Sequence, residues 1–331
     1  MPSPASWRRF KPDNFLLAIV AAAIVASILP ATGRAVDVLS WTVKVLIAVL
    51  FFLYGARLSP QQSLEGLKHW RLHGTILSFT YVVFPLLGLT LHVLVPQVLT
   101  EQLYLGMLYV TLVPSTVQSS INFTSIAKGN VAGAIVSASF SNLLGVVLTP
   151  LLVLSLMSTT GGLTVEPGAI LDIVVQLLIP FVLGQLSRRW TSGYVATHTK
   201  LKLVDQGSIV LVVYSAFSAG MREQMWTKVG LGDIVALIAV CIALLAFVLW
   251  LTWRVSGWLG FTRADRIAIQ MCGTKKSLAT GVPMATVLFA GMPIVGLIVL
   301  PLMVFHQAQL MACGTLAARY ARQAETDAVP A

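Results

Sequence analysis

The chain has 331 residues, of which 57% are hydrophobic and only 10% are charged, whereas about 25% are charged in an average soluble domain. This small number of charges cannot solvate a globular surface. The composition therefore excludes a soluble domain and predicts an integral membrane protein. The net charge of +10 would suggest nucleic-acid binding in a soluble protein, but basic residues standing singly or in pairs between apolar blocks are typical of cytoplasmic loops, so we expect no nucleic-acid partner.

Ten apolar windows along the chain approach the roughly 20 residues that a helix needs to cross a bilayer core about 30 Å thick. Gly, Pro, Ser or charged residues separate them, as expected at helix ends. The sequence therefore predicts an all-α integral membrane protein with a single transmembrane domain over residues 1–331. The windows cover residues 14–30, 38–54, 72–95, 102–127, 131–157, 169–186, 203–221, 234–258, 267–289 and 292–318.

The first window follows a basic segment and could instead be a secretory signal peptide. The linker "STTGGLTVEPG", residues 158–168, divides the ten windows into five and five. Because five is odd, the second half would enter the membrane inverted, as in many transporters. Cleavage of the first window would spoil this match, so we favour a membrane helix there and two inverted repeats over 14–157 and 169–318.

The distribution of Lys and Arg predicts the orientation in the membrane. With the N-terminus inside, sixteen of the 22 basic residues fall in cytoplasmic stretches and three fall in outer ones. This excess favours ten helices with both termini cytoplasmic. The expected location is the plasma membrane, which in a bacterium is the inner membrane.

The fourth window contains a proline followed by a dense polar run. Pro114 lies 13 residues from Glu101 and 14 from Lys128, or about 20 Å from either end of a helix, so it is deep. Proline removes a backbone donor, and such breaks persist in lipid only where protein or water surrounds them. A kinked helix whose hydroxyls bond their own backbone is the alternative, but we favour a functional break. The polar residues after the proline are Ser115, Thr116, Gln118, Ser119, Ser120 and Asn122.

The ninth window contains two adjacent lysines, Lys275 and Lys276, in "MCGTKKSLATGVPMA". Lys275 is 9 residues from Arg266, about 14 Å along a helix. If the lysines stood in a cytoplasmic loop, the chain would end outside, against the charge distribution. We therefore expect them to be buried charges at a second helix break, and an intramembrane cation indicates a functional site. Gly273, Thr274, Ser277, Thr280, Gly281 and Pro283 surround them and disfavour a continuous helix.

Other polar residues carry less weight. Lys44 can reach the outer interface beside Trp41, and Asp172, Asp205 and Gln206 lie near helix ends. Polar residues of the fifth and tenth windows could line the same cavity or bond helix to helix. We find no nucleophile–base pair or metal cluster, so we expect no enzyme and no cofactor other than a coupling ion, Na⁺ or H⁺. The fifth- and tenth-window residues are Ser137, Ser139, Ser141, Asn142, His306, Gln307 and Gln309.

The segments "VPSTVQSSINFTSIAKGN" and "CGTKKSLATGVPMA" resemble the two crossover helices of the bile acid:sodium symporter superfamily, in particular its SBF-like branch. The resemblance covers essentially the whole chain. It implies ten helices, with a panel (first, second, sixth and seventh) and a core (the others). The fourth and ninth helices would break and cross in the core, where characterised symporters hold two sodium ions beside an anionic organic substrate.

The resemblance carries over only in part to the ion sites. Pro114, Ser115 and Thr116 stand where the family has proline–glycine–glycine, and its sodium-binding serine and asparagine fall near Ser119 and Ser120. Ser137 and Ser141 are close to hydroxyls that the family has on its fifth helix. The glutamate shared by both sodium sites aligns with Gln270, and the following glutamine and asparagine align with Thr274 and Lys275.

Loss of this carboxylate removes the charge that would neutralise Na⁺, and a nearby ammonium adds repulsion. We hypothesise that Lys275 or Lys276 occupies the space of at least one sodium ion. Coupling would then use protons through a desolvated lysine, use a single remaining ion near Ser119, Ser120 and Gln270, or be absent.

The predicted function is secondary transport of a small organic anion across the lipid bilayer by alternating access, because half-helix N-termini and lysines favour negative charge. Pro114 and residues 273–281 break the helices. The oxygen donors would be Gln118, Ser119, Ser120, Asn122, Gln270 and Thr274, with Ser277 and Pro283 beside them. The alternative is a non-transporting membrane regulator of ion homeostasis, since eukaryotic SBF-like relatives are associated with calcium.

Overall fold

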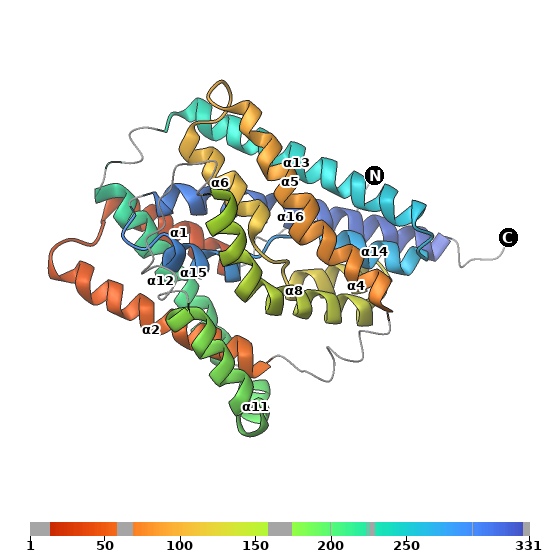
Figure 1. Cartoon of the computed structure of the whole chain (residues 1–331), viewed down its shortest axis with the longest axis horizontal. Helices are drawn as coiled ribbons and strands as arrows, with labels where there is room; N and C mark the ends of the chain where they lie inside the picture. The colour runs from red at the N-terminus through yellow and green to blue at the C-terminus, as the bar shows by residue number, and fades with distance from the viewer. Residues whose placement is uncertain are drawn as a thin grey trace, which may run out of the picture.

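The computed structural model describes residues 14–57, 69–157, 174–198, 200–222, 224, 229–292 and 294–326. All regular structure in these ranges is helical (Figure 1). This confirms the predicted all-α class. The linker 158–168, Asp172 and the basic residues before residue 14 lie outside the described residues.

The helices of the first half of the chain follow the predicted windows, with irregular turns inside the third and fifth. Two of these turns, η3 and η5, are π-helical, and η4 is a 3₁₀ turn. In chain order the elements are α1 (Asn14–Ile28), α2 (Arg34–Arg57), α4 (Trp70–Ser78), η3 (Phe79–Val83), α5 (Phe84–Thr90), η4 (Leu91–Leu94), α6 (Glu101–Leu112), α7 (Gln118–Ile126), α8 (Val131–Leu152) and η5 (Val153–Met157).

The described part of the second half is also helical, with one short π-helical turn, η6, at its start. The last helix, α16, runs eight residues beyond the predicted end at Ala318, and this extension contains Arg319 and Arg322. The elements are η6 (Val174–Leu178), α11 (Ile179–Thr197), α12 (Lys200–Arg222), α13 (Leu231–Trp258), α14 (Arg263–Gly273), α15 (Leu278–Leu288) and α16 (Val295–Thr326).

Within the described residues, six helical stretches are long and apolar enough to cross a membrane, as expected for a multi-pass membrane protein. Of the other four predicted windows, two are split into the short pairs α6–α7 and α14–α15. The first is the 15-residue α1, and α11 carries Arg188 and Arg189 in its middle. The six are Arg34–Arg57, Trp70–Leu94, Val131–Met157, Leu203–Arg222, Leu231–Trp258 and Val295–Thr326.

The helices α1, α2, α11 and α12 pack mainly on one another, with α2 against α11 and α1 against α12 (Figure 1). Glycines allow the closest of these contacts. A Cβ at Gly55 of α2 would collide with the carbonyl oxygen of Phe181, and one at Gly184 of α11 would collide with that of Phe52. The two helices therefore approach backbone to backbone at two reciprocal points, as small residues permit in membranes.

The remaining helices surround the two split pairs. α6 and α13 pack against α16, α14 packs against α4, α7, α8 and α13, and α15 contacts both α16 and α12. Side-chain caps begin four of these helices: the side chains of Thr100, Asn130, Thr262 and Ser277 accept backbone N–H groups of the first turns of α6, α8, α14 and α15. α12 contacts α2, α15 and α16, and so joins the two groups of helices.

Candidate functional site

The two predicted breaks are present. α6 ends at Leu112 and α7 begins at Gln118, which leaves residues 113–117 as the first break. α14 ends at Gly273 and α15 begins at Leu278, which leaves residues 274–277 as the second break. The second break is shorter than the predicted region 273–281, because α15 continues through Gly281 and Pro283.

The two breaks are hydrogen-bonded directly to each other. The Ser115 hydroxyl donates to the carbonyl oxygen of Cys272 at 2.6 Å, near the C-terminal end of α14. The Ser277 backbone N–H donates to the carbonyl oxygen of Pro114 at 2.8 Å. Segments about 160 residues apart in sequence thus satisfy backbone groups that no helix can satisfy, as a buried break requires.

At each break, side chains of the long helix that follows form hydrogen bonds with both backbone groups of one residue. On α8, the Ser141 hydroxyl accepts the Ser115 N–H at 3.1 Å and the Asn142 amide donates to the Ser115 carbonyl at 2.7 Å. On α16, the Gln309 amide does both for Lys276: its oxygen accepts the N–H at 2.8 Å and its nitrogen donates to the carbonyl at 2.8 Å. Ser115 and Lys276 therefore hold equivalent positions in the two breaks.

Both lysine side chains are 0% exposed, which excludes a solvated loop, but their surroundings differ. The Lys276 ammonium donates to the carbonyl oxygens of Thr80, Thr111 and Val113 at 3.0, 2.8 and 3.0 Å. It also lies 4.2 Å from the centre of the Phe84 ring. Its three donors are fully used.

The Lys275 ammonium has no hydrogen-bond partner among the described residues. It lies 3.9 Å from the centre of the Phe123 ring of α7. Two thiols, those of Cys272 and Cys313, are near enough to interact with it electrostatically. A cation–π contact compensates only part of the loss of water, so the burial of this ammonium is only partly compensated.

The predicted oxygen donors of the fourth window separate into two sets. Thr116, Ser119 and Ser120 form a hydroxyl cluster at the start of α7, with oxygens 2.7 and 3.2 Å from that of Thr116. Gln118 and Asn122 bond to each other at 3.2 Å and are exposed. The first set borders the buried break and the second faces away from it.

The side chain of Gln270 is fully engaged elsewhere. Its nitrogen donates to the carbonyl oxygen of Leu249 at 2.8 Å, and its oxygen accepts from the Tyr320 hydroxyl at 2.9 Å. Within the part of the chain that the structure describes, no hydrogen bond joins it to Ser119 or Ser120. The Thr274 hydroxyl, in turn, donates to the Gln270 carbonyl at 2.6 Å.

The other predicted residues pair across helices. Ser137 lies 2.6 Å from a ring nitrogen of His73 on α4. Thr280 donates to the Asn142 oxygen at 2.9 Å, and the Ser277 hydroxyl donates to Thr280 at 3.1 Å. Of the polar residues of α8 and α16, Ser141, Asn142, His306 and Gln309 contact backbone groups of the two breaks.

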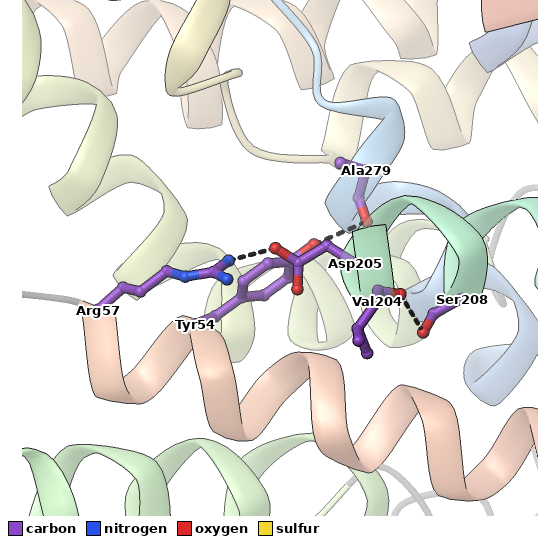
Figure 2. A network of polar contacts seen from close by, with 6 residues as sticks. All are labelled: Tyr54, Arg57, Val204, Asp205, Ser208 and Ala279. Atoms are coloured by element: carbon purple, nitrogen blue, oxygen red, sulfur yellow. Dashed lines mark hydrogen bonds and ion pairs between the residues drawn. The ribbon is translucent and has the colours of Figure 1, made fainter. Parts of the chain in front are cut away.

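A separate polar network joins α2 to α12 and to α15 (Figure 2). The Arg57 guanidinium pairs with the Asp205 carboxylate, whose helix end was expected to be merely interfacial. Beside this pair the Tyr54 hydroxyl donates to the carbonyl oxygen of Ala279 at 3.3 Å. This carbonyl is free because residue 283, its usual helical partner, is a proline. Pro283 therefore contributes a backbone acceptor.

The groups that contact the two lysine ammoniums were not predicted from the sequence. They are the carbonyls of Thr80, Thr111 and Val113, and the rings of Phe84 and Phe123. One signal was available. In η3 the Phe84 N–H bonds to Phe79, so Thr80 would need the N–H of residue 85, which is Pro85. A proline in the middle of an apolar window thus indicates a free carbonyl nearby.

Comparison with known proteins gives one consistent result. The sequence pattern of the SBF-like CPA transporter family matches residues 13–322. A Pseudomonas aeruginosa protein, PA2026, is 50% identical over 316 residues, 95% of each chain. The Escherichia coli protein named "Putative symporter YfeH" is 45% identical over 95% of this chain and 94% of its own. Sodium/bile acid cotransporter 7 of Danio rerio is 28% identical over 92% of each chain.

Proposed function

Because the chain belongs to the SBF-like CPA transporter family, a family of transporters and not of enzymes, we propose that it is a secondary transporter that carries a small organic anion by alternating access. The names of the E. coli and zebrafish relatives, a symporter and a sodium/bile acid cotransporter, support this class of transport and substrate. The proposed location is the plasma membrane, the inner membrane in a bacterium, with both termini cytoplasmic.

The proposed architecture has ten membrane crossings in two inverted five-helix repeats, residues 14–157 and 169–318. The equivalent roles of Ser115 and Lys276 support the repeat, because each is held by its backbone from the helix after the break. The group α1, α2, α11 and α12 would be the panel, and the remaining helices the core that moves against it. In such transporters the substrate binds where the broken helices meet.

The Lys275 ammonium is the observation that carries the choice of an anion. It is completely buried and has no hydrogen-bond partner among the described residues, which is costly unless a negative charge joins it. The hydroxyl cluster of Thr116, Ser119 and Ser120 at the start of α7 adds neutral donors and the positive end of a helix dipole. A carboxylate or sulfonate would satisfy both.

Uptake into proteoliposomes tests this function. Purified protein would be offered radiolabelled bile acids and a panel of small mono- and dicarboxylates, with imposed Na⁺ or pH gradients. We expect saturable uptake of at least one anion, and a loss of tenfold or more in Lys275→Gln, because the substrate loses its counter-charge. Lys44→Gln, at an exposed lysine of α2, is the control and should retain uptake.

The same experiment separates transport from the alternative. A non-transporting regulator would show no flux of any anion in either gradient, although the protein is folded. Uptake that is unchanged in Lys275→Gln would retain the transport function but refute the proposed counter-charge.

A further inference from the structure

The surroundings of the Lys276 ammonium are those of a bound monovalent cation. Three carbonyl oxygens, those of Thr80, Thr111 and Val113, accept its three N–H groups at 2.8 to 3.0 Å. The Phe84 ring, 4.2 Å away at its centre, contributes the attraction of an aromatic face for a cation. Hard monovalent ions in membrane proteins are likewise bound by backbone carbonyls in place of water. We name these three oxygens the carbonyl cluster.

Each member of the carbonyl cluster is available for a specific backbone reason. Thr111 and Val113 lie at the C-terminal end of α6, where carbonyls have no intrahelical donor and the helix dipole is negative. The Thr80 carbonyl is free because the shifted bonding of η3 assigns it to Pro85, which has no N–H. Without a cation, three buried acceptors would be left without donors.

The backbone of Lys276 is fixed as firmly as its side chain. Gln309 bonds to both its N–H and its carbonyl, and a ring nitrogen of His306 lies 3.2 Å from the same carbonyl. At the equivalent position of the first break, the Ser115 hydroxyl also bonds to the C-terminal end of a helix from the other half of the chain, at the Cys272 carbonyl of α14. The Ser115 side chain is a neutral hydroxyl, so of the two breaks only the second places a positive charge at the C-terminal end of a helix.

We infer that the Lys276 ammonium is a tethered cation that permanently fills a binding site for a monovalent ion, formed by the carbonyl cluster and Phe84. The protein therefore needs no Na⁺ at this place, and the two lysines have different roles: Lys276 stabilises the crossing of the broken helices, and Lys275 receives the substrate. The second role rests on the proposed function, whereas the first does not.

Thermal unfolding of the purified protein tests the tethered cation without any transport measurement. Wild type, Lys276→Ala and Lys275→Ala would be compared at one ionic strength in choline, sodium and methylammonium chloride. We expect Lys276→Ala to lower Tm by at least about 5 °C in choline. Na⁺ or methylammonium should restore several degrees of this loss in a saturable manner, because these ions fit the vacated site and choline does not.

Lys275→Ala is the matched control, since it removes an adjacent, equally buried ammonium that has no carbonyl partners. Its Tm should stay within about 2 °C of wild type, with no specific response to Na⁺ or methylammonium. Equal responses of the two variants, or a Lys276→Ala variant as stable as wild type, would overturn the inference. If Na⁺ raised Tm by the same amount in wild type and in Lys276→Ala, sodium would bind elsewhere, and this result would also overturn the inference.

If Lys276→Ala does not fold, Lys276→Met answers the same question, because it keeps most of the side-chain volume without the charge. This variant should be less stable than wild type in all three salts and should gain nothing from Na⁺, since its own methyl group fills the site. A Lys276→Met protein as stable as wild type would show that the carbonyl cluster needs no cation.

Discussion

At the first break Ser141 and Asn142 hold Ser115 by its backbone, and at the second break Gln309 holds Lys276 in the same way. The residues thus held differ. Ser115 directs a neutral hydroxyl to the end of α14, whereas Lys276 directs an ammonium to the end of α6. The same backbone arrangement, used at both breaks, therefore places a positive charge at the second break only. The second break also contains Lys275, whose ammonium has no hydrogen-bond partner among the described residues.

Removal of Gln309 should have the largest effect on this arrangement. Gln309→Leu leaves the N–H and the carbonyl of Lys276 buried without these partners, each worth about 1–2 kcal/mol. We expect the free energy of unfolding to fall by about 2–4 kcal/mol, measured by thermal or denaturant unfolding in detergent. Gln307→Leu, two residues along α16, is the control, because the Gln307 oxygen has no partner in the described part of the chain. A similar loss in both variants would contradict the special role of Gln309.

Asn142→Leu makes the corresponding change at the first break and should cost less, about 1–2 kcal/mol. Of the two backbone groups of Ser115, Asn142 bonds only to the carbonyl, while Ser141 accepts the N–H; Asn142 also accepts from the Thr280 hydroxyl. Its side chain is also half-buried, whereas that of Gln309 is fully buried. The same unfolding measurement ranks the two. If Asn142→Leu lowered the free energy of unfolding more than Gln309→Leu, the hydrogen bonds to the backbone of Lys276 would not be the stronger of the two sets.

The sequence predicted where the chain breaks but not how the breaks are satisfied. Pro114 lies in the first break and Gly273 ends α14 at the second, and these signals are local, so they can be read from the sequence. The partners of Lys275 and Lys276 come from residues 80–123, more than 150 positions away. Adjacent lysines point to different neighbours only once the helices are packed, so the sequence left open which of them would occupy a cation site.

Gln270 shows a second limit of prediction from sequence. Its alignment with an ion-binding carboxylate predicted an oxygen donor near Ser119 and Ser120. In the structure its oxygen accepts from Tyr320, near the end of α16, and its nitrogen reaches α13. A neutral amide has both a donor and an acceptor to satisfy, so replacing a carboxylate by an amide changes which neighbours the side chain selects.

The smallest predicted effect concerns the contact of α15 with α2, which would have to change if the panel moves against the core. Tyr54 donates to the Ala279 carbonyl at 3.3 Å (Figure 2), and Pro283 cannot supply the helical N–H that this carbonyl would otherwise accept. Tyr54→Phe should therefore lower the free energy of unfolding by about 1 kcal/mol. The effect stays modest because the hydrogen bond is long.

A double-mutant cycle with Pro283→Ala tests this reason directly. Alanine at 283 restores an N–H that the Ala279 carbonyl can accept within α15, so Tyr54 would no longer be its sole donor. The cost of Tyr54→Phe should then fall from about 1 kcal/mol to less than about 0.5 kcal/mol, a coupling between residues on α2 and α15. Equal costs in the two backgrounds would mean that Tyr54 contributes by packing alone. In that case the hydrogen bond from Tyr54 would contribute nothing to the stability of the contact between α2 and α15.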